Sequence, residues 1–583
     1  MNIRGKKIIW PLAGVLLILI AGGVYLLLQQ MKSEEVPAYN GHGGTFKNTL
    51  AEIDTPDPSV IYKAGYYYMT FTHNGTDIMV MKSRTLDFRQ AERAVVWYPP
   101  VESPYSAEIW APEIQFIQGK WYIYFAADNG QNENHRMYAL EGDSEDPMGS
   151  YTFKGQIKDE TDKWAIDGLV MEHEQKLYFV WSGWEGDVNE AQNTYIAPMS
   201  DPLTISGPRV LLSEPDLDWE KAGGPPYINE GHSILHKDDR VFIIYSGAGS
   251  WTPYYSLGML ALKPGSDPLD PAGWEKAQQP LLNMDEEAGV FGPGHNSFAS
   301  SPDGSEQWIV YHATSGAADG WNNRKARAAK VTWDDGGLPV FGKPQALSTP
   351  VEVPSGMGIF WAGDAASEGE RLTFPNLPST VDTIIPLLVH YKNTNDSKGS
   401  VEMLINGTGG YTIELPAIDG DETGYAYTAI PFTSGMNELS FNTAGANIEI
   451  LAIEIPRYEA ETALLEGGSE AEENPFASNG SIASLYDEGS SVRFINVQVP
   501  QSGVYTLSIA AINPSQDGAE LGISVNSGKE KAAVIKPQER NEVELIHMEL
   551  ELKAGRNEIS VFDRKGSFGI DYMDVWHKPN EHR

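Results

Sequence analysis

The sequence predicts an all-β fold whose largest part is a five-bladed β-propeller. A short strand, a turn and an aromatic β-hairpin recur five times, and the hairpins begin near Ala64, Gln118, Glu174, Asp238 and Ser305. Their spacings of 54, 56, 64 and 67 residues suit four-stranded blades with connecting loops. Side chains alternate along the hairpins, and 58 glycines and 37 prolines supply turns. The alternative, an all-β sandwich with fortuitous hairpins, does not explain the same order of elements in all five repeats.

The first 32 residues predict a cytoplasmic tail and one N-terminal transmembrane helix that acts as a signal anchor. The run Ile8–Leu28 has no charged residue, and ~20 residues at 1.5 Å rise are enough to cross ~30 Å of hydrocarbon. Three basic residues precede the run, so the rest of the chain is expected to be extracellular. A cleaved signal peptide, which would make the protein secreted, is the alternative, although no Ala-x-Ala site follows the run. Residues 33–47 are polar and predict a linker.

The chain is strongly acidic, with 42 Lys and Arg against 80 Asp and Glu and a net charge of −38. This charge repels nucleic acid and anionic lipid headgroups. No nucleic-acid partner is therefore expected, and the membrane is expected to be contacted only through the N-terminal helix. A neutral substrate is favoured over a polyanion. Cysteine is absent from the sequence, which excludes disulfides, cysteine-type zinc sites and thiol catalysis.

The repeats place the propeller at residues 48–349, and a change in composition marks its end. The stretch Ser348–Met357 holds proline and serine and has no periodicity, which predicts a boundary. Beyond it, alternating strands separated by turns continue through residues 358–456 and 457–578. These two segments are predicted to be accessory all-β modules.

The heads of the five repeats predict a catalytic site. The head positions are Asp57, Ala111, Asp167, Glu230 and His295. Because the innermost strands of a propeller converge on one axis, two aspartates and one glutamate are expected to meet there as an acid–base site. Each acid taken alone fits a turn residue beside proline or glycine, but their common position in the repeat favours the catalytic interpretation. His295 is either a satisfied buried histidine or part of a metal or water site on the axis.

The propeller segment resembles glycoside hydrolase family 43, a family of inverting enzymes with five-bladed propellers. Six motifs carry the resemblance: TPDPSVIY at Thr55–Tyr62, IWAPEIQFIQGKWYIYF at Ile109–Phe125, AIDGLVME at Ala165–Glu172, NEGHSIL at Asn229–Leu235, GPGHNSF at Gly292–Phe298 and RKARAAKVTWDDGGLPVFG at Arg324–Gly342. The resemblance implies that Asp57 is the general base, that Glu230 is the general acid and that Asp167 tunes and orients the acid. It also implies that His295 supports a bound calcium ion or its waters. No cofactor is expected for the chemistry itself.

Inversion sets physical requirements for these carboxyl groups. The base and the acid are expected to lie ~6.5–9.5 Å apart, which leaves room for the attacking water. Glu230 must keep its proton near neutral pH, and an ionised Asp167 nearby would raise its pKa. Asp57 must stay ionised and needs hydrogen-bond donors around it. Glu113, two residues beyond Ala111 on the same strand face, is expected as a further polar group near the site.

The resemblance favours an exo-acting α-L-arabinofuranosidase that trims arabinan or a related plant polysaccharide. The segments WTPYY, GPGHNSFASSPDG and RKARAAKV look most similar to that branch. Trp110, Trp184 and Trp251 are candidate pocket walls, since sugar rings stack on aromatic faces, or else they pack inside blades. Arg324 either points to the axis or pairs with a blade carboxylate. A β-xylosidase, an endo-arabinanase and a non-catalytic glycan-binding protein are the alternatives, and the complete acidic trio favours an enzyme.

The C-terminal third resembles carbohydrate-binding modules of families 6 and 35, which are β-sandwich jelly rolls. The matching segments are YEAETALLEGG from Tyr458 and GIDYMDVW near the C-terminus. The resemblance implies that Glu459, Glu461 and Asp571 form a structural calcium site of hard oxygen ligands, and an exposed acidic strand end is the alternative. Residues 358–456 look like a degenerate copy of the same sandwich without the Glu-x-Glu opening. Both modules are expected either to bind glycan or only to brace the propeller.

Overall fold

The computed structural model describes residues 39–89, 91–420, 422–513, 515, 517–538 and 542–577. This part of the chain is all-β, as predicted, with strands β1 to β44 joined by turns and loops. Its four helices are single 3-10 turns, which span Asn132–Asn134, Pro271–Gly273, Ala362–Asp364 and Ala460–Thr462.

The predicted transmembrane helix requires a correction. Among the described residues, no helix is long and apolar enough to cross a membrane. A three-residue 3-10 turn rises about 6 Å, whereas the hydrocarbon core of a bilayer is about 30 Å thick. The part of the chain that the structure describes is therefore all-β and contains no membrane-spanning helix. The run on which the helix was predicted, Ile8–Leu28, lies outside the described residues.

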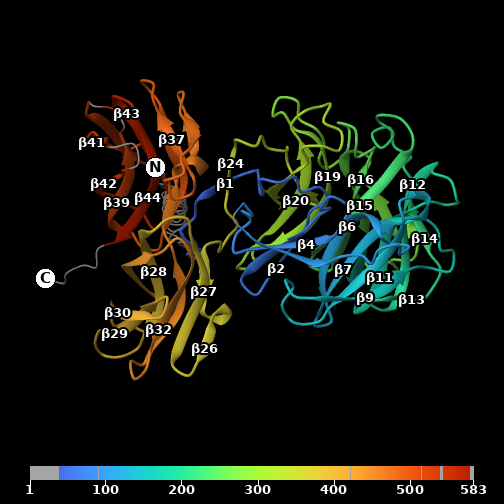
Figure 1. Cartoon of the computed structure of the whole chain (residues 1–583), viewed down its shortest axis with the longest axis horizontal. Coiled ribbons are helices and arrows are strands. Elements are labelled where there is room, and N and C mark those ends of the chain that lie inside the picture. The colour runs from blue at the N-terminus through green and yellow to red at the C-terminus, as the bar shows by residue number, and fades with distance from the viewer. Residues whose placement is uncertain are drawn as a thin grey trace, which may run out of the picture.

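Five antiparallel blades are arranged as a propeller (Figure 1), and blades three and four are joined into one sheet by two parallel residue pairs, Ala191 with Tyr227 and Gln192 with Ile228. Their inner strands are β2 (Ser59–Lys63), β6 (Ala107–Ile117), β10 (Ala165–His173), β15 (Tyr227–Lys237) and β19 (Phe291–Ser300). Each inner strand contacts the next one along the chain, and β19 contacts β2, so the inner strands form a closed ring. The heads of strands that are far apart in the sequence therefore meet around one axis.

The outer strands complete each blade in chain order. Blade one adds β3 (Tyr66–Thr70), β4 (Ile78–Ser83) and β5 (Glu92–Trp97), and blade two adds β7 (Lys120–Asp128), β8 (Arg136–Gly142) and β9 (Tyr151–Ile157). Blade three adds β11 (Lys176–Gly183), β12 (Ala191–Asp201), β13 (Thr204–Ile205) and β14 (Val210–Ser213). Blade four adds β16 (Arg240–Gly247), β17 (Ser256–Leu262) and β18 (Trp274–Lys276), and blade five adds β20 (Gln307–Thr314) and β21 (Lys325–Lys330). The short strands β22 (Thr332–Trp333) and β23 (Pro339–Val340) pair with each other.

The N-terminal edge of the propeller covers the open side of blade five. The Leu50 N–H donates to the Ala326 carbonyl at 3.2 Å, and the Thr55 N–H donates to the Arg324 carbonyl at 2.9 Å. Just before this segment, β1 (Thr45–Lys47) pairs with β24 (Pro350–Glu352). The two ends of the propeller are thereby joined, which leaves β21 without a free edge on that side.

A left-handed residue lies near the start of every inner strand of the propeller, just before β2 and within the first five residues of the others. The φ angles are +56° at Asp57, +44° at Ala111, +53° at Asp167, +58° at Gly231 and +42° at His295. Backbone of this kind is unusual for residues other than glycine, and in strands it accompanies bulges that redirect side chains. The strand pairing shifts by one residue at these points in β6, β10, β15 and β19.

In blade four the left-handed residue is Gly231, so the predicted head position Glu230 is displaced by one residue. Glu230 pairs with Ser246 before the shift, as Ile166 pairs with Ser182 in blade three. A Cβ atom at Gly231 would lie 3.1 Å from the Cα of His295. Only glycine fits there, and the acidic side chain of this blade therefore comes from the preceding residue.

Two β-sandwiches follow the propeller and are stacked beside it (Figure 1). The first pairs a sheet of β25 (Ile359–Trp361), β33 (Ile448–Glu454), β28 (Thr383–Asn393) and β31 (Gly424–Phe432) with a sheet of β26 (Ala366–Glu368), β27 (Arg371–Ser379), β32 (Gly435–Asn442), β29 (Gly399–Ile405) and β30 (Thr408–Leu415). Its core is a single cluster of buried apolar side chains drawn from both sheets.

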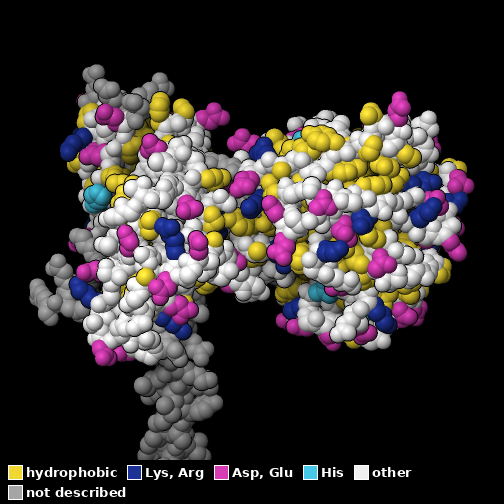
Figure 2. All heavy atoms as spheres, turned by 60° about the horizontal axis from the view of Figure 1, so that its bottom comes forward, with side chains coloured by type: hydrophobic (Ala, Val, Ile, Leu, Met, Phe, Trp, Pro, Cys, Tyr) yellow, Lys and Arg dark blue, Asp and Glu magenta, His cyan; other side chains and the backbone are white. Residues whose placement is uncertain are grey.

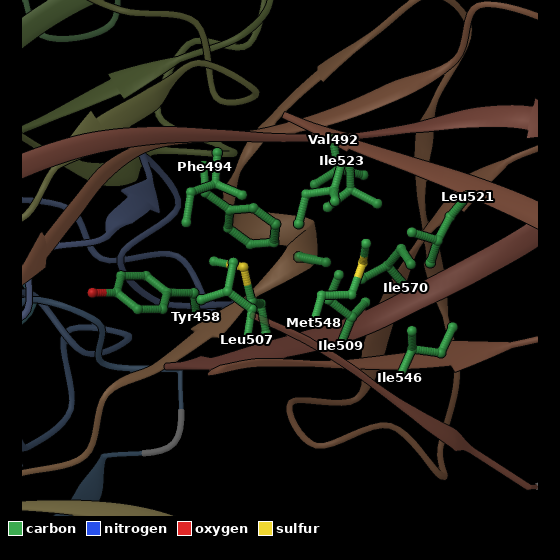
Figure 3. Packing of buried hydrophobic residues seen from close by; sticks show 14 of the residues in the cluster. Tyr458, Val492, Phe494, Leu507, Ile509, Leu521, Ile523, Ile546, Met548 and Ile570 are labelled. Atoms are coloured by element: carbon green, nitrogen blue, oxygen red, sulfur yellow. The ribbon is translucent and has the colours of Figure 1, made fainter. Parts of the chain in front are cut away.

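The second sandwich has the same plan. One sheet contains β34 (Arg457–Glu459), β36 (Glu470–Glu473), β37 (Ser481–Leu485), β44 (Phe568–His577), β39 (Gly503–Ile512) and β42 (Glu544–Leu552). The other contains β35 (Leu464–Glu466), β38 (Ser491–Val499), β43 (Gly555–Lys565), β40 (Ala519–Val525) and β41 (Lys531–Ile535). Figure 3 shows side chains of both sheets meeting between them, among them Leu507, Ile523 and Met548. Burial of this apolar surface is the main term that stabilises each module.

The described end of the predicted linker contacts both sandwiches. The buried Glu454 carboxylate of the first sandwich accepts from the His42 N–H at 2.6 Å and from the Tyr39 hydroxyl at 3.2 Å. In the second sandwich, the Asn496 carbonyl accepts from the Gly44 N–H at 2.6 Å. Burial alone would raise the pKa of Glu454, but hydrogen bonds from His390 and His42 lower it to about 2. Residues 39–47 thus connect the sandwiches to the propeller.

The acidic residues do not gather in one place. Figure 2 shows Asp and Glu side chains spread over the visible face of both the propeller and the sandwiches. Such a distribution raises the solubility of the chain without creating a defined anionic binding surface on that face.

Candidate active site

Three carboxylates from the heads of the inner strands meet around His295 on the propeller axis. The His295 Nδ1 atom lies 3.4 Å from Asp57 Oδ1 and 3.8 Å from Asp167 Oδ2, and Nε2 lies 3.1 Å from Glu113 Oε1. His295, Asp167 and Glu113 are each at most 5% exposed. Asp57 and Asp167 therefore meet on the axis as predicted, and Glu113 joins them.

The three carboxylates make His295 a cation. Burial alone would lower its pKa, but Asp167, Asp57 and Glu113 together raise it to about 10. A protonated imidazole has no free lone pair, and both ring nitrogens already face carboxylates. That His295 supports a calcium ion or its waters stays a prediction.

Asp57 is held in its ionised form by a ring of donors. The Thr72 hydroxyl donates to Oδ2 at 2.7 Å, and Arg324 Nη1 lies 3.3 Å from Oδ1. Burial alone would raise the pKa of Asp57, but Arg324 and His295 outweigh it and hold the pKa well below its usual range. Arg324 therefore points to the axis, which decides between the two predicted orientations.

The left-handed turn at Asp57 is fixed by a neutral histidine. The Asp57 N–H donates to His312 Nδ1 at 3.0 Å, and burial keeps the pKa of His312 well below its usual value. Similar bonds fix the other heads: Ala111 N–H donates to the Thr72 hydroxyl, and Gly231 N–H donates to Asp167 Oδ2, both at 2.8 Å. The site is therefore held rigidly by the same turns that aim its side chains.

Glu230 is held in the opposite protonation state. Its side chain is buried, and burial together with the charge of Asp167 raises its pKa to about 8. The Tyr255 hydroxyl donates to Glu230 Oε1 at 3.1 Å. Burial likewise raises the pKa of Asp167 to about 6, although its neighbour His295 and the Gly231 N–H favour the ionised form. One buried carboxyl group thus keeps its proton at neutral pH while Asp57 loses it, which suits a general acid paired with a general base.

Two of the three predicted aromatic walls present a face to solvent. Trp110 is half-buried and stacks on His135 at 4.1 Å between ring centroids. Trp251 is 37% exposed and makes an edge contact with Trp321. Trp184 requires a correction, because it is only 3% exposed and stacks on Trp164 at 4.8 Å. Its ring packs inside blade three and offers no face to a sugar.

Two site residues, and one exposed tryptophan on a neighbouring loop, were not predicted. Tyr255 and Thr72 contact the two key carboxyl groups, and Trp321 is the most exposed tryptophan of the described residues at 60%. Thr72 and Tyr255 lie in loops that follow or precede strands, where no periodic pattern marks them. The turn-rich stretch around Trp321, with glycine and two asparagines beside it, was the one local signal that could have pointed to an exposed aromatic side chain.

The predicted calcium ligands of the second sandwich interact electrostatically with one another; Glu461 and Asp571 are buried, and Glu459 is partly buried. Burial raises the pKa of Glu459, Glu461 and Asp571, and Coulomb repulsion from neighbouring carboxylates adds to it. The Asn479 amide donates to Glu461 Oε1 at 2.6 Å, and the Ser478 N–H donates to Asp571 Oδ1 at 3.0 Å. Glu461 Oε2 is buried without a hydrogen-bond partner.

No group of three or more His, Cys, Asp or Glu side chains has the spacing of a metal site anywhere in the part of the chain that the structure describes. The module's donor set nevertheless suits calcium, because its ligands are carboxylates and one buried oxygen lacks a partner. Binding would require these carboxylates to exchange hydrogen bonds from Ser478 and Asn479 for the metal.

Comparison with protein families gives two matches. Residues 46–339 match the model of glycosyl hydrolases family 43, and residues 456–578 match the model of carbohydrate binding module family 35. The first match covers half of the chain and contains all of the propeller residues of the candidate site. The second contains the three carboxylates of the second sandwich.

Curated proteins from bacteria and a fungus are similar to the propeller. An extracellular exo-α-(1→5)-L-arabinofuranosidase of Streptomyces avermitilis is 37% identical over 322 residues, which cover 53% of this chain and 66% of that protein. The α-L-arabinofuranosidase 43 of Humicola insolens is 34% identical, over 50% of this chain and 62% of that protein. An extracellular exo-α-(1→5)-L-arabinofuranosidase of Streptomyces chartreusis is 34% identical, over 43% of this chain and 76% of that protein. The chain therefore spans just under two thirds of the first two relatives.

Proposed function

This chain belongs to glycosyl hydrolases family 43, and on that premise we propose that it is an inverting, exo-acting α-L-arabinofuranosidase. Its substrate is arabinan or a related polysaccharide that carries arabinofuranose. The proposal is supported by two carboxyl groups of the propeller site whose surroundings favour opposite protonation states at neutral pH: Arg324, His295 and Thr72 keep Asp57 ionised, and burial and the charge of Asp167 keep Glu230 protonated. The choice of sugar is supported by the names of the three similar proteins.

We propose one step for each of the two carboxyl groups. Asp57 accepts a proton from a water molecule as the water oxygen attacks the anomeric carbon from one face of the sugar. Glu230 donates its proton to the glycosidic oxygen as the bond from that oxygen to the anomeric carbon breaks. The product carries the opposite anomeric configuration, and exchange of one proton with solvent at each group restores the starting state. Asp167 acts through Glu230, because its charge raises the acid's pKa.

The donors around Asp57 explain how it stays a base inside a buried site. Thr72, Arg324 and His295 all place hydrogen-bond donors or positive charge beside its carboxylate. Those contacts stabilise the ionised form before catalysis. They also orient the carboxylate, which favours a fixed position for the attacking water.

Product analysis tests the proposal directly. The purified protein is expected to release arabinose as a monosaccharide from linear and branched arabinan, and proton NMR is expected to show the β-anomer first. Release of xylose from β-xylosides with no arabinose would move the function to the β-xylosidase alternative, and oligosaccharide products would indicate endo action. A folded protein without turnover on any of these substrates would favour the glycan-binding alternative.

The pH dependence of activity is expected to report Glu230. The acid must be protonated, so kcat/KM is expected to fall as pH rises through about 8. Asp167→Asn removes the charge that raises this pKa, so the alkaline limb is expected to move to lower pH. Asparagine tolerates the left-handed backbone at residue 167, which keeps the turn intact. The measurement is a pH profile of kcat/KM beside that of Asp238→Asn, an exposed control in a left-handed turn, and unchanged alkaline limbs in both variants would contradict the role of Asp167.

We also propose that Glu459, Glu461 and Asp571 hold a structural calcium ion in the second sandwich. An ion that binds only the folded module would stabilise it by about 2.7 kcal/mol at 100 times its Kd. Calcium is expected to raise the unfolding temperature of the wild-type protein in calorimetry, and a chelator to reverse the effect. Glu461→Gln is expected to lose the response, while Glu470→Gln, an exposed control, keeps it. A response that Glu461→Gln retains in full would contradict this site.

The place of action follows from the same relatives. Two of the three similar proteins carry the word extracellular in their names. We propose that this enzyme also acts outside the cell, where its polysaccharide substrate is found. The family 35 match supports a glycan as the partner of the second sandwich.

A further inference from the structure

Two exposed tryptophans lie side by side at the rim of the propeller above blades four and five. Trp251 is 37% exposed and Trp321 is 60% exposed, and their ring centroids are 5.9 Å apart at an interplanar angle of 81°. They come from different blades, Trp251 from the loop between β16 and β17 and Trp321 from the loop between β20 and β21. We refer to this pair as the aromatic corner.

The loop of Trp251 leads directly to the proposed acid. Tyr255, four residues further on, is fully buried and donates its hydroxyl to Glu230 at 3.1 Å. The loop between them is held by the Thr252 N–H and hydroxyl, which donate to the Gly249 carbonyl at 2.9 Å and 2.8 Å. A Cβ atom at Gly249 would lie 2.6 Å from the Trp251 ring, so the ring folds closely over its own backbone.

The loop of Trp321 leads in the same way to the proposed base. The Trp321 carbonyl accepts from Arg324 Nε at 3.2 Å, and the other end of that guanidinium contacts Asp57. The Trp321 indole N–H reaches across to the Ser250 hydroxyl at 3.1 Å, which ties the two loops together. Asp319 and Asn322 close the remaining turns of the loop.

The aromatic corner is therefore exposed but held by hydrogen bonds. The loop of Trp251 is connected to Glu230 through Tyr255, and the loop of Trp321 is connected to Asp57 through Arg324. Ordered exposed aromatic side chains mark ligand grooves, because burying them recovers apolar surface at little cost in side-chain entropy. A sugar ring has an apolar face that packs on such side chains. None of the contacts described above for the catalytic residues involves the indole ring of Trp321.

From this geometry we infer that the aromatic corner binds the sugar residue next to the scissile bond on the leaving-group side. If the proposed function holds, on which this site rests, the sugar bound there is the penultimate arabinofuranose of an arabinan chain. The side follows from Glu230: the acid protonates the leaving oxygen, and the loop of Trp251 ends in the residue that contacts the acid. Binding energy from this remote sugar would raise the rate for oligosaccharides over simple glycosides.

The test compares a substrate that places sugars on the leaving-group side with one that places only a methyl group there. The full-length protein and its Trp321→Ala and Trp321→Tyr variants are assayed on α-1,5-linked arabinotriose and on methyl α-L-arabinofuranoside. The alanine variant keeps the backbone carbonyl that receives Arg324, so the catalytic pair is not disturbed. We expect Trp321→Ala to lower kcat/KM on arabinotriose roughly fivefold or more, with a change below roughly twofold on the methyl glycoside. Trp321→Tyr, which keeps an aromatic face, is expected to recover most of the loss.

The outcomes separate this inference from the proposed function. Equal losses on both substrates, or no loss on either, would overturn the leaving-group site while leaving the arabinofuranosidase intact. A wild-type protein that cleaves neither substrate would overturn the proposed function and this inference with it. A loss confined to arabinotriose and recovered by tyrosine supports both.

Discussion

Asp57→Asn is expected to lower kcat by roughly 10²–10⁴-fold on every substrate, whatever its leaving group. The water molecule needs a base in all cases, and no other carboxylate of the site is placed to replace one that Arg324, Thr72 and His295 hold ionised. Asparagine suits the positive φ of residue 57 and keeps the size of the side chain, so the turn is retained. Initial rates on arabinotriose and on an activated aryl arabinofuranoside give the comparison.

The matched control for this variant is Asp54→Asn. Asp54 lies in the same segment, is partly exposed and pairs with Lys325 at the surface at 3.0 Å. Surface ion pairs of this kind contribute about 0–1 kcal/mol, so near-normal activity is expected. Circular dichroism and the unfolding temperature establish that both variants are folded. Activity of folded Asp57→Asn within about tenfold of wild type would exclude Asp57 as the base.

Glu230→Gln is expected to give a loss that depends on the leaving group. Polysaccharide and oligosaccharide leaving groups need a proton, so kcat is expected to fall by roughly 10²–10⁴-fold. A leaving group that departs as a stable anion, such as 2,4-dinitrophenolate, needs no proton, and its rate is expected to fall by less than about tenfold. The alkaline limb of the pH profile, which belongs to Glu230 with its pKa raised to about 8, is expected to disappear with that substrate.

This contrast distinguishes the acid from the base within one experiment. Glu275→Gln, on the exposed side of the outer strand β18, is the control for loss of a glutamate charge in the same blade. Equal losses of Glu230→Gln on both kinds of leaving group would contradict the assignment of Glu230 as the acid. Equal losses would instead fit a role in folding or substrate binding.

The register of blade four explains the one displaced prediction at the site. A repeat read from sequence aligns residues by their order, and it aligned Glu230 with Asp57 and Asp167. The structure aligns Gly231 with them, because the left-handed turn there leaves no space for a Cβ atom beside His295. In a regular strand, a shift of one residue moves a side chain to the opposite face of the sheet. Glu230 nevertheless reaches the axis, from the position before the turn.

The exposure of the tryptophans is a second property that the sequence pattern could not predict. Trp110, Trp184 and Trp251 look alike in sequence as aromatic residues near strand ends. Trp184 is covered by Trp164, a neighbour 20 residues earlier in the chain, whereas Trp251 meets Trp321 from the next blade and stays exposed. Exposure depends on which distant side chains pack against a ring, and local pattern contains no information about that.

The sequence alone determined the repeats, the all-β class and the identity of the acidic residues, because strand periodicity and turn chemistry are local properties. Only the tertiary structure decided the protonation states. Closure of the ring brings His295 between Asp57, Asp167 and Glu113, which come from three other blades, and places Arg324 beside Asp57 and Tyr255 beside Glu230. A pKa depends on burial and on charges within a few ångströms. Those neighbours are separated by up to 267 positions in the chain, so their effect exists only after the propeller has closed.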